Sequence, residues 1–124
     1  MEKYVLLIED DLPLQKAYQM KFAAKGVALR IVNDGKEMMQ LLKENIMERP
    51  AAVVLDLLLP YVSGFELLET MRKTKGWEEV PVIIVSNIKD EVGVQKAEHL
   101  GVKNYFIKTG LKLDDAVERI QNYF

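Results

Sequence analysis

The stretch VVLDLLLP, residues 53–60, is an apolar run that contains one carboxylate and ends in a proline. Its first three residues are apolar and two of them are β-branched, which is typical of a buried strand. An unpaired charge inside such a strand would be costly, so Asp56 is predicted to lie where the strand ends. There it either caps the next element or presents a reactive carboxylate, and the rest of the chain decides between these readings.

Strand-like and helix-like segments alternate on both sides of this stretch. Apolar or alternating runs predict strands, and apolar residues at helical spacing predict helices, as in the segment that Pro13 opens and Gly26 closes. The predicted strands are 4–9, 28–32, 51–56, 80–87 and 102–108, and the predicted helices are 12–26, 34–46, 63–74, 90–101 and 112–124. Five strand–helix repeats predict an α/β fold, a doubly wound parallel sheet with helices on both faces.

Composition narrows the class of protein. The chain has 124 residues, 49% of them hydrophobic, which predicts one domain over residues 1–124. Its net charge of −2, with both signs mixed along the chain, predicts no direct nucleic-acid binding. No apolar run is long enough to span a membrane, and the absence of Cys excludes disulfides and thiolate metal sites.

Four of the predicted strands deliver polar groups to one edge of the sheet. The first ends in Glu9, Asp10 and Asp11, and the third, fourth and fifth end in Asp56, Ser86 and Lys108. Each could be an ordinary strand end or helix cap if taken alone. Ligands bind beyond the carboxyl ends of parallel strands, however, so together these side chains predict a site.

The residue types indicate which chemistry this site carries out. Carboxylates gathered on one edge repel each other and would have raised pKa values without a cation, which predicts a metal ion. Oxygen ligands alone favour a hard ion, Mg²⁺. An ammonium and a hydroxyl suit phosphoryl oxygens, and a carboxylate can itself accept a phosphoryl group, so Asp56 is the predicted acceptor.

With these residues at these positions, the chain resembles the receiver domain of two-component response regulators, typified by the chemotaxis response regulator. The resemblance spans the whole chain. It depends on the order and spacing of five short motifs, IEDD (8–11), LDLLLPYVSG (55–64), IIVSN (83–87), NYF (104–106) and FIK (106–108). It implies a flavodoxin-like (βα)5 fold with strand order 2-1-3-4-5.

The resemblance also implies roles for individual residues. Asp56 is the phosphoacceptor, Ser86 and Lys108 bind the phosphoryl group, and Tyr105 is an aromatic switch. The metal ion is Mg²⁺. Its implied ligands are Asp11 directly, Asp10 through water, Asp56 and the backbone carbonyl of Leu58.

As a whole, the resemblance implies a cytoplasmic phosphorelay protein. It receives phosphate from a sensor histidine kinase or phosphotransfer protein and acts on a downstream protein target. It is not an enzyme beyond self-catalysed phosphotransfer and dephosphorylation. Lys103 and Asn104 stand where a dimerising subfamily has acidic residues, which favours a monomer or weak dimer.

Two departures from the family pattern lie beside the predicted site. Thr109 follows Lys108 where the family has proline, which predicts a trans bond and an altered loop path at Gly110. Asn87 follows Ser86 where the family has a small alanine. These departures keep open an alternative, a pseudo-receiver docking module without phosphate turnover. A Mg²⁺-dependent phosphohydrolase is a weaker alternative, because Leu58 stands where that class has a second Asp.

Overall fold

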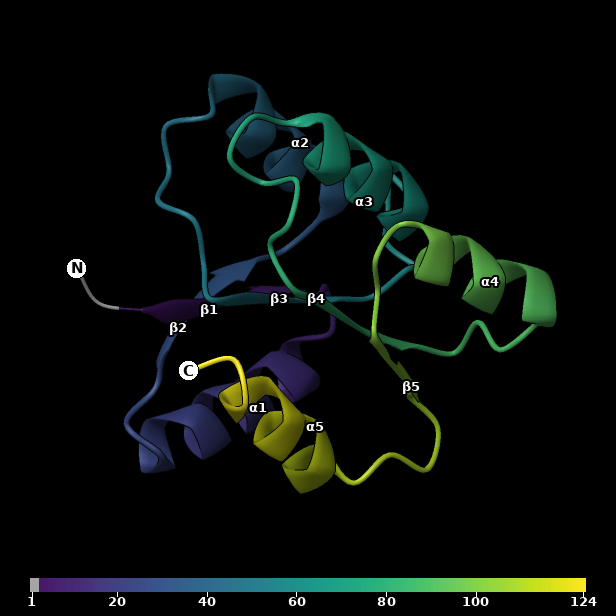
Figure 1. The fold of residues 1–124 in the computed structure, drawn as a ribbon. Coiled ribbons are helices and arrows are strands. Elements are labelled where there is room, and N and C mark those ends of the chain that lie inside the picture. Colours follow the sequence, from purple (N-terminus) through teal and green to yellow (C-terminus); the bar gives the residue numbers. More distant parts are fainter. Residues whose placement is uncertain (1–2) are drawn as a thin grey trace.

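The computed structural model describes residues 3–124 and contains five strands and five helices in strict alternation (Figure 1). All five strands are parallel and pair in the order β2-β1-β3-β4-β5, which confirms the predicted topology. The elements are β1 (Tyr4–Ile8), α1 (Leu12–Ala24), β2 (Ala28–Val32), α2 (Gly35–Glu44), β3 (Ala52–Leu55), α3 (Gly64–Lys73), β4 (Val82–Ser86), α4 (Glu91–His99), β5 (Asn104–Ile107) and α5 (Leu113–Gln121).

The sheet separates two layers of helices (Figure 1). Because successive strand side chains point to opposite faces, Val5 and Leu7 pack towards α1 and α5, whereas Leu6 and Ile8 pack towards α2 and α3. The three central strands are buried on both faces, which explains their nearly continuous apolar sequences. Among residues 3–124, no helix is long and apolar enough to cross a lipid bilayer.

Side chains that precede the helices fix where they begin. Asp11, Asp34, Ser63 and Asp90 each accept a hydrogen bond from a backbone N–H in the first turn of the following helix. The observed helices are shorter than predicted. α1, for example, ends at Ala24 rather than at Gly26, whose φ of +68° turns the chain out of the helix.

The start of α3 lies against the end of β3. A Cβ atom at Gly64 would lie 2.5 Å from the Cα of Leu57 and 2.6 Å from the carbonyl oxygen of Asp56. The Gly64 N–H also donates to the Leu57 carbonyl at 3.0 Å. Glycine is therefore required at this position, and the contact holds Asp56 at the mouth of the sheet.

Candidate active site at the carboxyl edge

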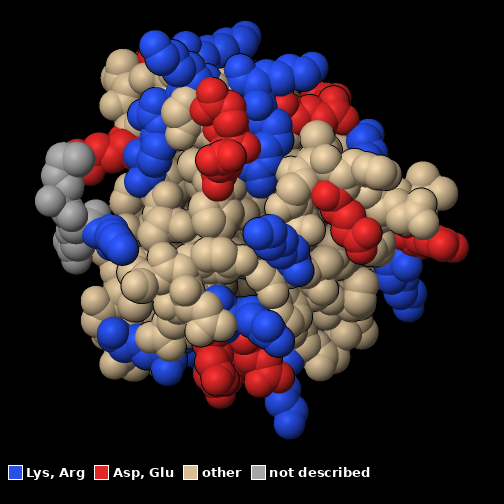
Figure 2. Space-filling model, in the orientation of Figure 1, with Lys and Arg blue, Asp and Glu red and all other residues tan. Residues whose placement is uncertain are grey.

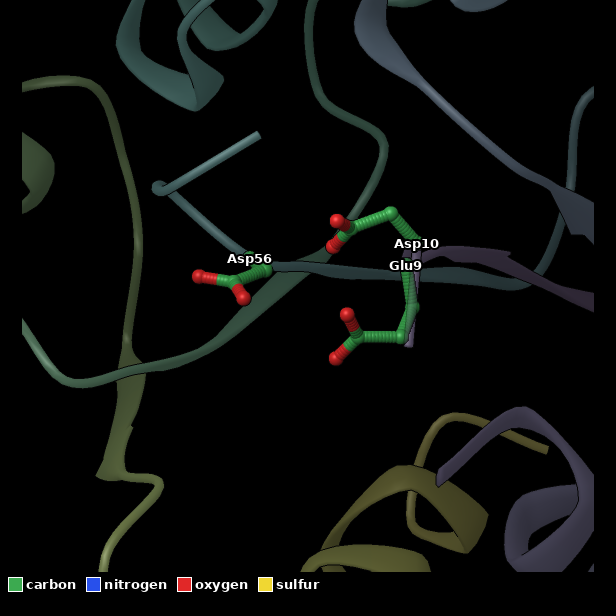
Figure 3. Close-up of side chains that lie close together, drawn as sticks. All are labelled: Glu9, Asp10 and Asp56. Atoms are coloured by element: carbon green, nitrogen blue, oxygen red, sulfur yellow. The ribbon is translucent and has the colours of Figure 1, made fainter. Parts of the chain in front are cut away.

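The carboxyl edge of the sheet brings three acidic side chains together. Glu9 and Asp10 follow β1, Asp56 follows β3, and one carboxylate oxygen from each lies within 4.8 Å of the others. Figure 3 shows the three side chains and the strands that carry them. Glu9 is 2% exposed and Asp56 is 5% exposed, whereas Asp10 is open to solvent. The arrangement is an acidic site that is buried on one side and accessible on the other.

Lys108 supplies the positive charge within this site. Its Nζ lies 2.9 Å from Glu9 Oε1 and 2.9 Å from Asp56 Oδ2. Burial alone would lower the pKa of Lys108, but its hydrogen bonds to Glu9 and Asp56 and their charges outweigh burial and raise that pKa. Lys108 is therefore a permanent cation shared by two buried carboxylates.

The remaining bonds of the carboxylates set their orientation. Asp56 Oδ1 accepts the Leu58 N–H at 3.0 Å, and Glu9 Oε2 accepts the Asp11 N–H at 3.2 Å. Burial raises the pKa of Glu9, although the hydrogen bond from Lys108 opposes the rise. Three carboxylates and one ammonium leave an excess of negative charge, and oxygen ligands of this kind suit a hard divalent cation.

Asp11 does not join this cluster, which differs from the role that the resemblance implies for it. Its carboxylate is exposed and accepts the N–H of Leu14 at 3.3 Å, as the N-cap of α1. The physical reason is the position of the helix start, because Pro13 in the first turn makes Asp11 the capping residue.

Sequence analysis placed Glu9 at this edge but assigned it no role, whereas the structure brings its carboxylate into the cluster. Glu9 is the first residue after β1, and its side chain is buried, whereas that of Asp10 is exposed. The helix start set by Pro13 was the signal that could have separated Asp11, as a helix cap, from Glu9 and Asp10.

The other predicted residues lie around the same edge. Ser86 is fully buried at the end of β4, and its Oγ accepts a long hydrogen bond of 3.4 Å from the Ile88 N–H. The half-buried Tyr105 donates its hydroxyl to the Ile88 carbonyl. The side chain of Leu58 is 57% exposed, and the metal-binding role of its carbonyl stays a prediction.

The chain takes the predicted path after Lys108. No cis peptide bond occurs in residues 3–124, so the Lys108–Thr109 bond is trans, and Gly110 has a φ of +81°. Thr109 donates its N–H and its hydroxyl to Asn87 Oδ1, at 2.9 Å and 2.8 Å. The two residues that depart from the family pattern are thus hydrogen-bonded to each other.

The chain is similar in sequence to known proteins. The family model of the response regulator receiver domain matches residues 5–121. The probable C4-dicarboxylate response regulator DctR of Bacillus subtilis is 35% identical over 122 residues, which are 96% of this chain and 51% of that protein. AfsQ1, a transcriptional regulatory protein of Streptomyces coelicolor, is 30% identical over 104 residues, or 84% of this chain and 44% of that protein. The chain spans about half the length of these curated relatives.

Solved structures agree with the sequence comparison. The receiver domain of the Francisella response regulator 1452 has a TM-score of 0.83 and 25% identity, and the match covers 98% of this chain and 96% of that one. The receiver domain of the sensor histidine kinase PA1611 from Pseudomonas aeruginosa, which carries a magnesium ion in its active-site cleft, has a TM-score of 0.80 and 20% identity over 99% of this chain and 98% of that one. With the family match over nearly its whole length, the chain belongs to the response regulator receiver domains.

Proposed function

We propose that this chain accepts a phosphoryl group on Asp56 from a phosphohistidine of a partner protein and thereby changes a surface that a second partner reads. The observation that carries this proposal is the Lys108 ammonium, 2.9 Å from the buried Asp56 carboxylate, in a cluster with two further acids. A purely structural ion pair needs one carboxylate for one ammonium. Three carboxylates around one ammonium destabilise the fold unless they bind something.

The proposed reaction uses groups that are already in place. An Asp56 carboxylate oxygen forms a bond to phosphorus while the P–N bond to the donor imidazole breaks, and the electron pair of that bond returns to the nitrogen. Lys108 and the Ser86 hydroxyl donate to the phosphoryl oxygens, where charge develops. Lys108 is already an ammonium ion when the phosphoryl group arrives, because its pKa is raised despite burial.

A divalent cation completes the proposed site. Glu9, Asp10 and Asp56 would hold it, and the predicted ligand role of Asp11 passes to Glu9 because Asp11 caps α1. When bound, Mg²⁺ neutralises the carboxylates and the incoming phosphoryl oxygens. The magnesium ion in the Pseudomonas aeruginosa receiver domain supports this choice of metal.

The proposed partners are proteins. A sensor histidine kinase or a phosphotransfer protein would supply the phosphoryl group, and Tyr105 would report its arrival by releasing the Ile88 carbonyl and turning inward. Lys and Arg are interspersed with Asp and Glu over the face in Figure 2, which favours a protein target for this chain. Transcriptional regulation by relatives such as AfsQ1 would then require the part of those proteins that lies outside the match.

The mass of the intact chain tests the proposal. After incubation with Mg²⁺ and acetyl phosphate, the wild type should gain one phosphoryl group, and Asp56→Asn should gain none. Glu9→Gln and Asp10→Asn should take up phosphate more slowly, and added Mg²⁺ should no longer accelerate uptake, because each variant removes a proposed ligand.

Asp11→Asn is the matched control, because asparagine caps a helix as well as aspartate does. It should take up phosphate at the wild-type rate. A wild-type chain that gains no mass would instead be a pseudo-receiver, a docking module without phosphate turnover. Loss of uptake in Asp11→Asn with full uptake in Glu9→Gln would restore Asp11 as the metal ligand.

A further inference from the structure

Asn87 and Thr109 join the two loops that carry Ser86 and Lys108. β4 ends at Ser86 and β5 ends at Ile107, so both residues lie just beyond the paired strands. Asn87 Oδ1 accepts two hydrogen bonds from Thr109, one from its N–H at 2.9 Å and one from its hydroxyl at 2.8 Å. Both residues are exposed, so burial does not force this pairing.

These bonds continue the ladder of the sheet by one step. The Lys108 N–H donates to the Ser86 carbonyl at 2.9 Å, and the next N–H along the chain, that of Thr109, donates to the side chain of Asn87. The peptide group before the Lys108 Cα is therefore bonded to Ser86, the last residue of β4, and the peptide group after it is bonded to Asn87, the next residue. Both backbone torsions of Lys108 are restrained.

The turn after Lys108 does not itself require these donors. The Leu111 N–H donates to the Lys108 carbonyl at 3.3 Å, and Gly110 has a φ of +81°, which is the pattern of a type II turn with Thr109 at its second position. That position accepts proline, which has no N–H. Threonine adds two donors there, and Asn87 accepts both.

We infer that Asn87 is a positioning residue that, through Thr109, holds the Lys108 main chain at a fixed distance from Ser86. The Lys108 ammonium and the Ser86 hydroxyl are then presented to Asp56 as one unit rather than from two independent loops. This inference rests on the proposed phosphoryl transfer. Positioning of this kind acts on the rate, because the groups that bind the phosphoryl oxygens must be aligned when the new bond forms.

The test measures phosphate uptake on Asp56 from acetyl phosphate and Mg²⁺, at a temperature well below unfolding. Asn87→Ala removes the acceptor, and Thr109→Pro removes both donors while suiting the turn. Each should slow uptake by about threefold to tenfold, less than the roughly hundredfold cost of a full 1 Å misplacement, because Lys108 keeps its bond to Ser86. The double variant should be no slower than the slower single variant, because both changes break the same link.

Three further measurements separate positioning from loop stability. Thr109→Ser keeps both donors and should restore the uptake rate. Asp90→Ala removes a cap from the other end of the β4–α4 loop, where Asp90 Oδ2 accepts the Gly93 N–H at 3.0 Å, and it should leave the rate unchanged. Hydrogen exchange of the Thr109 amide should accelerate in Asn87→Ala.

Several results would overturn the inference. Unchanged Thr109 exchange in Asn87→Ala would mean that the link does not form in solution. Faster exchange with an unchanged uptake rate would mean that the link fastens the loop without positioning Lys108. If the two reductions in uptake rate multiply in the double variant, the two residues act independently rather than through one link. If wild type is phosphorylated in each of these cases, only the inference fails, whereas a wild type without uptake removes the proposed function itself.

Discussion

At the carboxyl edge of the sheet three carboxylates surround one ammonium. At the opposite edge, where the strands begin (the amino edge), one guanidinium donates hydrogen bonds to three neutral carbonyls. Arg72, near the end of α3, donates to the carbonyl oxygens of Leu100 at 2.7 Å, Val80 at 2.8 Å and Trp77 at 3.3 Å. Its donors join the segments that lead into β4 and β5. The fully buried Trp77 lies in the first of these segments.

The difference between the edges lies in what their charges do when the protein is alone. At the amino edge, hydrogen bonds from a cation to carbonyls stabilise the fold without needing any further ion. At the carboxyl edge, excess negative charge opposes folding and is relieved only by a ligand. Substitutions at the two edges should therefore change stability in opposite directions.

The largest effect is expected for Trp77→Ala. Its indole is fully buried and its Nε1 has no hydrogen-bond partner among residues 3–124, so its contribution comes from packing. The free energy of unfolding should fall by about 3–5 kcal/mol. Urea unfolding followed by circular dichroism measures the change. Trp77→Phe should lose clearly less, and equal losses in the two variants would show that ring packing is not what matters.

Arg72→Met should have the next largest effect, because it keeps the apolar stem but leaves three carbonyls without their donor. We expect a loss of about 2–3 kcal/mol in the free energy of unfolding. Arg72→Lys should recover only part of this, since an ammonium cannot donate in the fixed planar geometry of a guanidinium. If Arg72→Met lowers the free energy of unfolding by less than about 0.5 kcal/mol, contacts other than the Arg72 hydrogen bonds stabilise this edge.

Asp10→Asn should act in the opposite direction in the absence of metal. Removing one of three clustered carboxylates relieves repulsion, so the metal-free protein should gain about 1 kcal/mol. Mg²⁺ should raise the unfolding temperature of the wild type and not that of the variant, because a ligand stabilises only the state that binds it. Thermal unfolding with and without Mg²⁺ measures both effects.

Asp11→Asn is again the control for this experiment, since it removes the neighbouring charge but keeps the helix cap. It should retain the full stabilisation by Mg²⁺. If Asp10→Asn destabilises the metal-free protein, the acidic cluster is not repulsive, and the contrast between the two edges disappears.

The smallest effect is expected at Tyr61, in the loop after the acceptor. Tyr61 is 82% exposed and has a φ of +69°, and a hydrogen bond of 2.8 Å from the Val62 N–H to the Pro60 carbonyl closes a three-residue turn around it. Holding a non-glycine residue at such a φ costs about 1–2 kcal/mol. Glycine avoids this cost, but its greater freedom in the unfolded chain offsets part of the gain.

Tyr61→Gly should therefore raise the free energy of unfolding by about 0.5–1 kcal/mol. Tyr61→Ala keeps a Cβ atom and should gain nothing, and guanidinium unfolding of the three proteins compares them. A loss of stability in the glycine variant would mean that the exposed ring makes contacts that outweigh the strain.

Much of this protein could be predicted from local sequence. The alternation of apolar strands with helical segments predicted the parallel sheet, because burial on both faces leaves nearly continuous runs such as VVL at 53–55. The same rule placed Asp56, Ser86 and Lys108 at one edge, since parallel strands end on the same side. These predictions depend only on the order of residues along the chain.

Other features depended on distances that the order of residues does not contain. Glu9 and Asp11 are both acids beside Asp10, but Asp11 caps α1 whereas Glu9 pairs with Lys108. The link between Asn87 and Thr109 joins residues 22 positions apart, and the bond between Arg72 and Leu100 joins residues 28 apart. Sequence by itself determined which polar groups reach the carboxyl edge of the sheet. Only the tertiary structure decided which of them bond to each other, because a hydrogen bond depends on a few ångströms between loops that sequence pattern leaves free.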